Sequence, residues 1–264
     1  MIPSNTGGKV FLSSISISVL TFVLMLGGAV LGSKLRHALP EHHLDSDAKD
    51  IVRLGTGLVA TISALVLGLL INSASSSYEA QRGEVRQMAA NIILLDQLLE
   101  RYGPETKPVR QLLRGGIDPL VTQLWGSMAG PGNQAIATEP SGNASRAYIA
   151  MHDLLPQSDT QRSIKAQVLQ TATDIQKSRL MLFERAHTGI PVPFLAILIF
   201  WLTIIFVSFC LFSPLNPTSA VALMFIALSA SAAIFLILEM GQPFSGLMQI
   251  SSQALRTALV PLAP

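Results

Sequence analysis

The sequence predicts an all-α membrane protein with four transmembrane helices and a helical soluble insert between the second and third. Two observations support this fold class: long runs without charged residues, and a 3–4 apolar periodicity over most of the remaining chain. Half of the 264 residues are apolar and only 13% are charged. Soluble domains usually carry about 25% charged residues. The composition therefore excludes an ordinary soluble globule and a disordered chain.

The charge-free runs predict the membrane spans. Residues 10–33 and 54–78 contain no Lys, Arg, Asp or Glu, and each run is long enough for one span. A bilayer core about 30 Å thick needs about 20 apolar residues as helix. The run 186–238 is long enough for two spans, and the sequence Pro-Leu-Asn-Pro at 214–217 interrupts it. The expected spans are 10–32, 53–76, 191–213 and 219–240.

The first span has an alternative interpretation as a cleaved signal peptide. Its apolar run is longer than the core of a signal peptide, and only Lys9 precedes it. No A-x-A cleavage site follows. A retained helix is therefore expected, because signal peptides combine a short apolar core with such a site.

Residues 77–190 form the predicted soluble insert, with 12 of the 18 basic and 11 of the 16 acidic residues. Apolar residues recur there every three or four positions, which predicts amphipathic helices. The first apolar stripe consists of Val85, Met88, Ile92, Leu95, Leu99 and Tyr102. Nothing between Asp50 and Tyr102 breaks a helix, so the second span is expected to continue into this stripe. Further helices are expected at about 109–124, 147–154 and 159–186, with a loop at 126–142.

The predicted domain division is 1–76, 77–190 and 191–264. The first part holds membrane helices one and two, the second is the insert, and the third holds membrane helices three and four plus a surface helix at 247–259. Basic residues near the membrane number four in the 33–53 loop and seven on the other side. The positive-inside rule then predicts an inner-membrane protein with cytoplasmic termini and a cytoplasmic insert.

Several stretches together resemble the bestrophin-like family of uncharacterised bacterial integral membrane proteins, a domain of unknown function. They are LPEHH at 39–43, LGTGL at 54–58, LGLL at 67–70, SY at 77–78, EVR at 84–86, NIILLD at 91–96, FWL at 200–202, LILE at 236–239 and PFSGL at 243–247. The resemblance implies distant kinship with bestrophins, which are pentameric anion channels with four membrane helices and cytosolic helices between them. Neck phenylalanines and calcium-binding acids of bestrophins have no matching positions here.

A stripe of small residues in the second span provides the candidate pore lining. Its members are Gly57, Thr61, Ala64, Gly68 and Ser75, with Asn72, Ser73 and Ser76 as polar lining near one mouth. Small residues also let helix backbones approach closely, so packing within a subunit or between subunits is the competing interpretation. The pair Gly28 and Gly32 in the first span is expected to serve packing.

Glu239 is the candidate intramembrane acid, because long apolar sequence flanks it on both sides. It either lies within the span with a functional role or reaches water at the end of the helix. His42, His43, Asp45 and Asp47 share one loop, but their spacing matches no metal-site pattern, so no metal or other cofactor is expected. Asp45, Ser46 or Asp47 is expected to cap the second span instead.

The functional expectation is an oligomeric bestrophin-like ion channel that conducts anions, with the second helix lining the pore. No enzyme motif is present, so no catalytic residue is assigned. The expected partners are the lipid bilayer, further copies of the chain and small ions, without nucleic acid. The alternative is a membrane scaffold or sensor without conduction, whose helical stalk binds partner proteins through an exposed stripe at 85–102.

Overall fold

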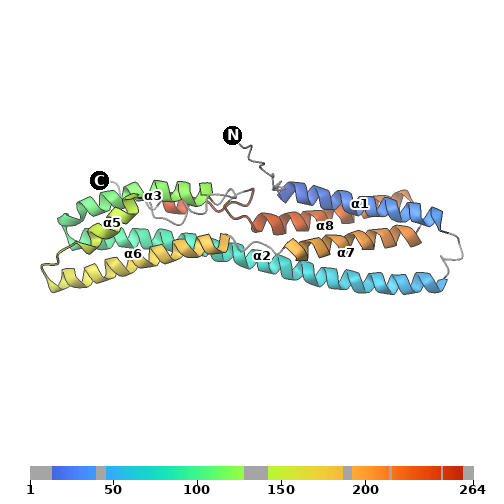
Figure 1. Ribbon diagram of the computed structural model, residues 1–264, viewed down its shortest axis with the longest axis horizontal. Coiled ribbons are helices and arrows are strands. Elements are labelled where there is room, and N and C mark those ends of the chain that lie inside the picture. Colours follow the sequence, from blue (N-terminus) through green and yellow to red (C-terminus); the bar gives the residue numbers. More distant parts are fainter. Residues whose placement is uncertain are drawn as a thin grey trace, which may run out of the picture. The chain divides into compact units, whose positions relative to one another are not determined.

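The computed structural model describes residues 14–39, 46–127, 142–186, 192–213, 216–244 and 246–257. No strand occurs in these residues, which confirms the predicted all-α class. The elements drawn in Figure 1 are α1 (Ser14–Ala38), α2 (Ser46–Tyr102), the 3-10 helix η2 (Pro104–Thr106), α3 (Lys107–Ser127), α5 (Gly142–His152), α6 (Asp159–Ala186), α7 (Val192–Phe212), α8 (Pro217–Met240) and α9 (Gln253–Thr257).

Four of these helices, α1, α2, α7 and α8, are long and apolar enough to cross a membrane, which confirms the predicted number of spans. The prediction that the second span continues to Tyr102 is also confirmed, because α2 is one helix of 57 residues. The described chain divides into two compact units. We call Met1–Ser75 with Ile190–Glu239 the membrane unit, and Ser76–Gly189 with Met240–Pro264 the second unit.

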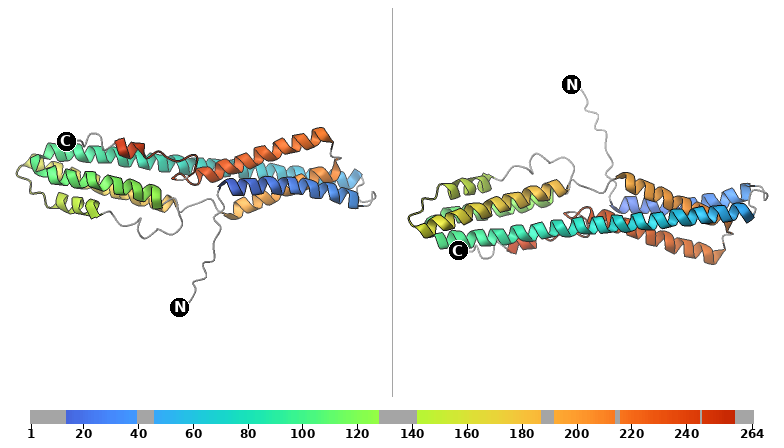
Figure 2. Two further views of the ribbon diagram at one scale, coloured as in Figure 1. Left: turned by 90° about the horizontal axis from the view of Figure 1, so that it is seen from above. Right: turned by 90° about the horizontal axis from the view of Figure 1, so that it is seen from below.

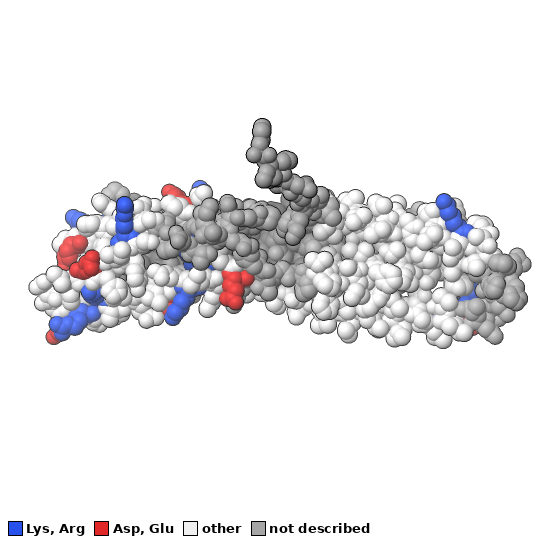
Figure 3. All heavy atoms as spheres, in the orientation of Figure 1, with Lys and Arg blue, Asp and Glu red and all other residues white. Residues whose placement is uncertain are grey.

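The core of the membrane unit is small and joins three helices. It consists of Met25 and Ala29 from α1, Phe206 and Cys210 from α7, and Ala227 from α8. Large apolar side chains cover the outside, and the face in Figure 3 is almost free of charged atoms except near the end where α1 leads to α2. Such a surface is stable in lipid, because lipid tails are as apolar as these side chains.

Two glycines of α1 allow this helix to pack closely against α7, and the two helices lie side by side in Figures 1 and 2. A Cβ atom at Gly28 would lie 3.0 Å from the carbonyl oxygen of Thr203. A Cβ at Gly32 would overlap the backbone of Val207. The expected packing role of Gly28 and Gly32 is therefore confirmed.

The second unit buries the apolar stripe of α2. Val85, Met88 and Ile92 lie in one core cluster, and Leu95, Leu99 and Tyr102 lie in another. Residues of α3 and α6 pack in both clusters, and residues of α5 pack in the second. The scaffold alternative required this stripe to be exposed. It is buried instead, because the other helices of the same chain cover it.

Pro119 lies inside α3, where it leaves one carbonyl without its helical donor. That carbonyl belongs to Gly115, four residues earlier. The side-chain amide of Asn143, near the start of α5, donates to the Gly115 oxygen at 3.1 Å. The two helices are therefore connected at the point where proline interrupts the backbone hydrogen bonding.

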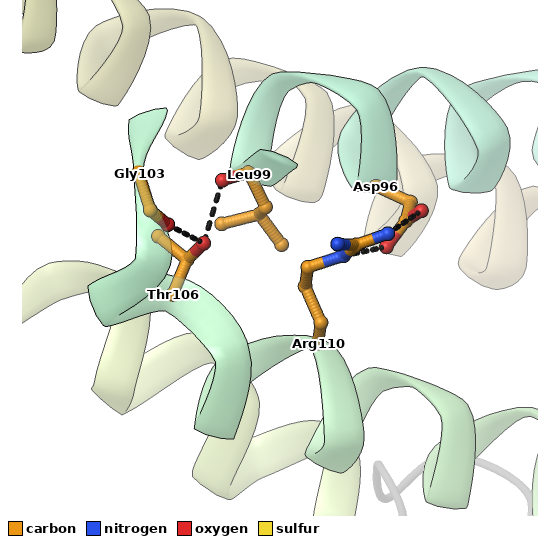
Figure 4. Close-up of polar contacts among 5 residues, drawn as sticks. All are labelled: Asp96, Leu99, Gly103, Thr106 and Arg110. Carbon is orange, nitrogen blue, oxygen red and sulfur yellow. Dashed lines mark hydrogen bonds and ion pairs between the residues drawn. The ribbon is translucent and has the colours of Figure 1, made fainter. Parts of the chain in front are cut away.

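Thr106 holds the turn between α2 and α3 (Figure 4). Its hydroxyl lies 2.6 Å from the carbonyl oxygen of Leu99 and 2.7 Å from that of Gly103, and it donates to these two acceptors. Gly103 has a φ of +143°, which side chains rarely adopt. The pair Gly103 and Pro104 therefore ends α2 sharply and lets the chain reverse into α3.

A buried ion pair lies next to this turn. The guanidinium of Arg110 on α3 donates two hydrogen bonds to the carboxylate of Asp96 on α2, at 2.6 and 2.7 Å (Figure 4). These hydrogen bonds raise the pKa of Arg110, although burial acts in the opposite direction. The bidentate geometry fixes the register of α3 against α2, because a planar fork fits a carboxylate in one orientation.

The segment after α8 belongs to the second unit, where Trp125 of α3 contacts it. The ring of Trp125 packs edge-on against Phe244 with centroids 5.4 Å apart, and its Nε1 donates to the Ile250 oxygen at 2.9 Å. The Ile250 amide donates to the Pro243 oxygen, so this segment forms a turn. The helix predicted at 247–259 is consequently wrong for its first part, and the described helix is limited to Gln253–Thr257.

Replacing Tyr102 by phenylalanine is expected to stabilise the second unit by about 1 kcal/mol. The Tyr102 hydroxyl is buried and has no hydrogen-bond partner among the described residues, and such a group costs about 1–3 kcal/mol. Burial, with a smaller contribution from Glu105, raises the pKa of the phenol above its ordinary value of 10.0.

The raised pKa gives a second expectation for the Tyr102→Phe variant. In the unfolded chain the Tyr102 phenol loses its proton at a lower pH than in the folded protein. The free energy of unfolding of the wild-type protein therefore falls as the pH rises above the pKa of the unfolded phenol, and that of the variant falls less. Thermal unfolding in detergent at neutral and alkaline pH measures both effects. Lower stability of the variant at neutral pH would contradict the assignment of Tyr102 as an unsatisfied hydroxyl.

Candidate pore helix

The part of α2 in the membrane unit presents three different faces. Ser63 and Ala74 are buried, and they lie about three turns apart on one side of the helix. A second side carries exposed leucines at 54, 58, 65 and 69. The small-residue stripe lies on the third side. Over its most apolar window, α2 also has the smallest buried share of the four membrane-length helices.

All members of the small-residue stripe are exposed within the single chain. They are Gly57, Thr61, Ala64, Gly68 and Ser75. A Cβ atom added at Gly57 or Gly68 would meet no atom within 4 Å. The stripe therefore does not pack against other described helices of its own chain. Two interpretations remain, contact between subunits and a pore wall.

Asn72, Ser73 and Ser76 are exposed as well, but they do not all share this face. At about 100° per residue, Asn72 lies near the edge of the stripe, and Ser76 lies about 100° away from Ser75. Ser76 therefore lies among the exposed leucines, and Ser73 lies farther round. Helix geometry therefore separates Ser73 and Ser76 from the residues that they were predicted to accompany.

The exposed stripe offers neutral polar groups to whatever covers it. The Thr61 hydroxyl donates to the Gly57 oxygen at 2.9 Å, which satisfies its donor and leaves its oxygen able to accept. Asn72 and Ser75 add an amide and a second hydroxyl. No charged side chain interrupts 54–78, so an ion passing this face would meet dipoles and small side chains only.

A groove that sequence reasoning missed lies at the start of α2. It has a volume of about 580 Å³ and is lined by Lys49, Arg53 and Gly57 on α2 and by Phe209 and Phe212 near the end of α7. The two helices are distant in sequence, so no spacing could indicate their contact. The groove places the cationic side chains of Lys49 and Arg53 and the acidic side chain of Asp50 beside one end of the stripe, and the net positive charge of the three favours anions.

Glu239 is the next-to-last residue of α8, and it is only 4% exposed. Glu239 therefore lies at the end of the helix, as the interpretation at the water interface expects, but other residues bury it within the single chain. An acid in this position satisfies its charge by interactions rather than by bulk water. Glu239 remains a candidate functional acid.

The loop residues His42, His43 and Asp45 lie outside the described residues, and so does the side chain of Asp47. Within the described part of the chain, no group of three or more His, Cys, Asp or Glu side chains could hold a metal ion. The capping role predicted for Asp45 likewise lies outside the described residues. The loop at 126–142 is described only at its ends, where α3 ends and α5 begins.

Comparisons with solved structures show the same fold. A variant of a bacterial bestrophin homologue from Klebsiella pneumoniae, with one tryptophan replaced by alanine, has a TM-score of 0.68 at 16% identity, covering 95% of this chain and 97% of that chain. The homologue from that organism solved by Zn-SAD phasing has a TM-score of 0.64 at 14% identity, covering 94% and 96%.

The family comparison covers most of the sequence. None of the curated proteins compared with the chain matches it. The model of the Bestrophin-like domain matches residues 23–255, which include all four membrane-length helices except the beginning of α1. Because this match spans well over half of the residues, the chain belongs to the bestrophin-like family.

Proposed function

We propose that this protein is one subunit of an oligomeric ion channel in the inner membrane, and that small anions pass along the small-residue stripe of α2. Family membership supports a channel, and the kinship with bestrophins implies anions as the conducted ions. The observation that carries the proposal is the exposure of the stripe on the membrane part of α2.

The chemistry of α2 argues against lipid as the neighbour of this stripe. Large apolar side chains, which suit lipid, lie on the adjacent face at Leu58, Leu65 and Leu69. Glycine and hydroxyl side chains gain little from lipid, but they allow close approach of helices and leave room for a lumen. In a ring of subunits with the stripe on its inner side, the small residues of α2 border the lumen and its leucines lie outside the lumen.

The proposed orientation has cytoplasmic termini and a cytoplasmic second unit, as the excess of basic residues on that side favours. In Figure 3 the charged atoms gather over the second unit, consistent with a water-facing domain. A fusion reporter inserted between α3 and α5 measures this orientation. Reporter activity on the periplasmic side would contradict it.

The channel proposal predicts that cysteines in the stripe control ion flux. The single native thiol, Cys210, is buried and can be replaced by alanine to remove background labelling. Thr61→Cys and Gly68→Cys would then be treated with a negatively charged thiol reagent after reconstitution into liposomes. Chloride flux is expected to fall to a small fraction of its original value, because the added group narrows the lumen and repels anions.

The matched controls are Ile62→Cys and Leu69→Cys, which directly follow the two stripe positions and so lie about 100° round the same helix, on its exposed apolar side. These thiols point away from the lumen in the proposed assembly, so the reagent should leave the ion flux through these variants unchanged. An intact oligomer that passes no small ion would contradict the proposal. Equal inhibition at stripe and control positions would show that α2 does not line the path.

The scaffold alternative receives no support from the fold. It required an apolar stripe at 85–102 that partner proteins could bind, and that stripe packs in the core of the second unit. Cross-linking of the purified protein separates the two functions. Cross-links between copies of the chain favour the channel, whereas capture of a different protein by the second unit favours the scaffold.

A further inference from the structure

The groove between the start of α2 and the end of α7 lies wholly within the membrane unit. Its volume of about 580 Å³ is within the range of about 300–1,000 Å³ that is usual for ligand sites. At about 100° per residue, Lys49 and Thr56 lie within about 40° of Ser63, which is buried farther along α2. The groove therefore extends the buried side of α2 towards the beginning of the helix, beside the small-residue stripe.

The lining of the groove changes from charged to apolar along α2. Lys49, Asp50 and Arg53 line the end nearest the beginning of the helix. Ala60 lines the other end, about 16 Å away at 1.5 Å per residue. On α7, Phe209 adds an aromatic ring to the wall. An inorganic anion would use only the charged end, whereas an amphipathic ligand would use both ends.

The charged end of the groove lies where the membrane span begins. The charge-free run starts at Leu54, directly after Arg53. Leu54 and Leu58 are exposed, as side chains that face lipid are. In Figure 3 the charged atoms drawn on the membrane unit lie at the end where α1 leads to α2. The charged end is therefore expected at the level of the lipid headgroups, and the apolar end at the level of the acyl chains.

The charges at this end suit a phosphate group. Lys49 and Arg53 are one helical turn apart, and both are exposed. Long flexible side chains of this kind extend their cationic groups to the headgroup level. With Asp50, two cations and one anion give the groove a net charge of +1, which balances the single negative charge of a phosphodiester. Charge-assisted hydrogen bonds from lysine and arginine to phosphate are strong.

We propose that the groove binds one anionic phospholipid, with its phosphate on Lys49 and Arg53 and an acyl chain along Phe209 and Ala60. Such a lipid fills the charged and the apolar ends together, and it contacts α2 and α7 at the same time. Its binding should therefore stabilise the membrane unit. A zwitterionic phospholipid adds an ammonium group that the two cations repel, so it should bind more weakly.

The proposal is tested on the full-length protein in detergent with dioleoyl phosphatidylglycerol as the anionic lipid. Native mass spectrometry measures how many lipid molecules each subunit retains, and thermal unfolding measures the stabilisation. Dioleoyl phosphatidylethanolamine tests the net charge, dioleoylglycerol tests the phosphate, and inorganic phosphate tests whether a free anion is sufficient. Phosphatidylglycerol is expected to bind at least about tenfold more tightly than each of the others and to raise the unfolding temperature.

Charge variants assign the binding to this groove. Lys49→Gln and Arg53→Gln should each weaken the binding of phosphatidylglycerol about fivefold, and the double variant about 25-fold. Lys34→Gln is the matched control, because Lys34 is an exposed lysine near the end of α1 that does not line the groove. Its affinity should not change. Equal losses for Lys34→Gln and Lys49→Gln would show a diffuse attraction to the protein surface and overturn the proposal.

A groove-filling variant tests the apolar end and leaves the charges in place. Ala60→Phe adds a ring inside the open groove, so the protein is expected to fold while the binding of phosphatidylglycerol is lost. Ile62→Phe is the control, because it adds bulk on the exposed apolar side of the same helix.

Three results would each overturn the proposal. They are unchanged binding in Ala60→Phe, equal affinity for phosphatidylglycerol and either phosphatidylethanolamine or inorganic phosphate, and a folded wild-type protein that retains no phosphatidylglycerol. Because none of these measurements involves ion flux, they remain decisive even if the proposed channel does not conduct.

Discussion

Replacing Gly32 by alanine is expected to disrupt the contact between α1 and α7 and to destabilise the membrane unit by about 3 kcal/mol. The added Cβ would fall on the carbonyl oxygen of Val207, closer than real Cβ contacts occur, and it would also lie 3.1 Å from the Val207 Cα. The obstacle is backbone rather than a flexible side chain, so the two helices must separate. Overpacking of this kind costs typically about 1–3 kcal/mol, and more where the backbone must shift.

The same helix provides a matched control in Gly27→Ala. A Cβ at Gly27 meets no atom within 4 Å, so this substitution adds the same methyl group without a contact in the chain. Thermal unfolding in detergent should show a lower midpoint for Gly32→Ala and an unchanged or higher one for Gly27→Ala. Equal midpoints for the two variants would show that α1 and α7 do not approach as closely as described.

The second large effect is expected from Asp96→Asn, which should destabilise the second unit by about 3 kcal/mol. Removing one charge of a buried pair leaves the other without its counter-ion, at a cost of about 3–5 kcal/mol. The Asp96 side chain is 4% exposed and that of Arg110 is 20% exposed. Because water still reaches part of Arg110, the expected loss of stability lies at the lower end of this range. The loss should appear as a lower denaturant midpoint in detergent.

Two comparisons separate this ion pair from general effects of charge. Asp174→Asn removes a carboxylate from an exposed pair with Lys177, so it should cost less than about 1 kcal/mol. The double variant Asp96→Leu with Arg110→Met should recover much of the loss, because apolar residues of similar size often replace a buried pair without penalty. A double variant no more stable than Asp96→Asn would contradict the role assigned to the unpaired Arg110.

The membrane spans and the stripe of the second unit could be predicted because each rests on a local physical requirement. A helix in lipid needs a charge-free run of a certain length, and the runs around Val10–Ser33 and Leu54–Tyr78 satisfy it. The residues from Val85 to Tyr102 repeat at the helical period, and the helix that this period predicts is confirmed. The spacing of Gly28 and Gly32 likewise indicated their packing role.

Other features could not be predicted because they join residues that are distant in the chain. The donor that replaces the missing amide of Pro119 comes from Asn143, and nothing in the spacing of the two indicates this contact. The groove beside Lys49 is formed by α2 and α7 together. The segment that ends at Ile250, whose oxygen accepts a hydrogen bond from Trp125, forms a turn where the sequence predicted part of a helix.

The sequence by itself determined that the protein is a membrane protein, that it is helical throughout most of the described residues and that α2 continues beyond its charge-free run, since solvation and helix periodicity act residue by residue. Only the tertiary structure decided which faces of α2 remain uncovered. It buried Ser63 and Ala74, buried the stripe that begins at Val85, and left Gly57 and Gly68 exposed. Exposure depends on which helices pack together, and that is a property of the whole chain rather than of any one segment.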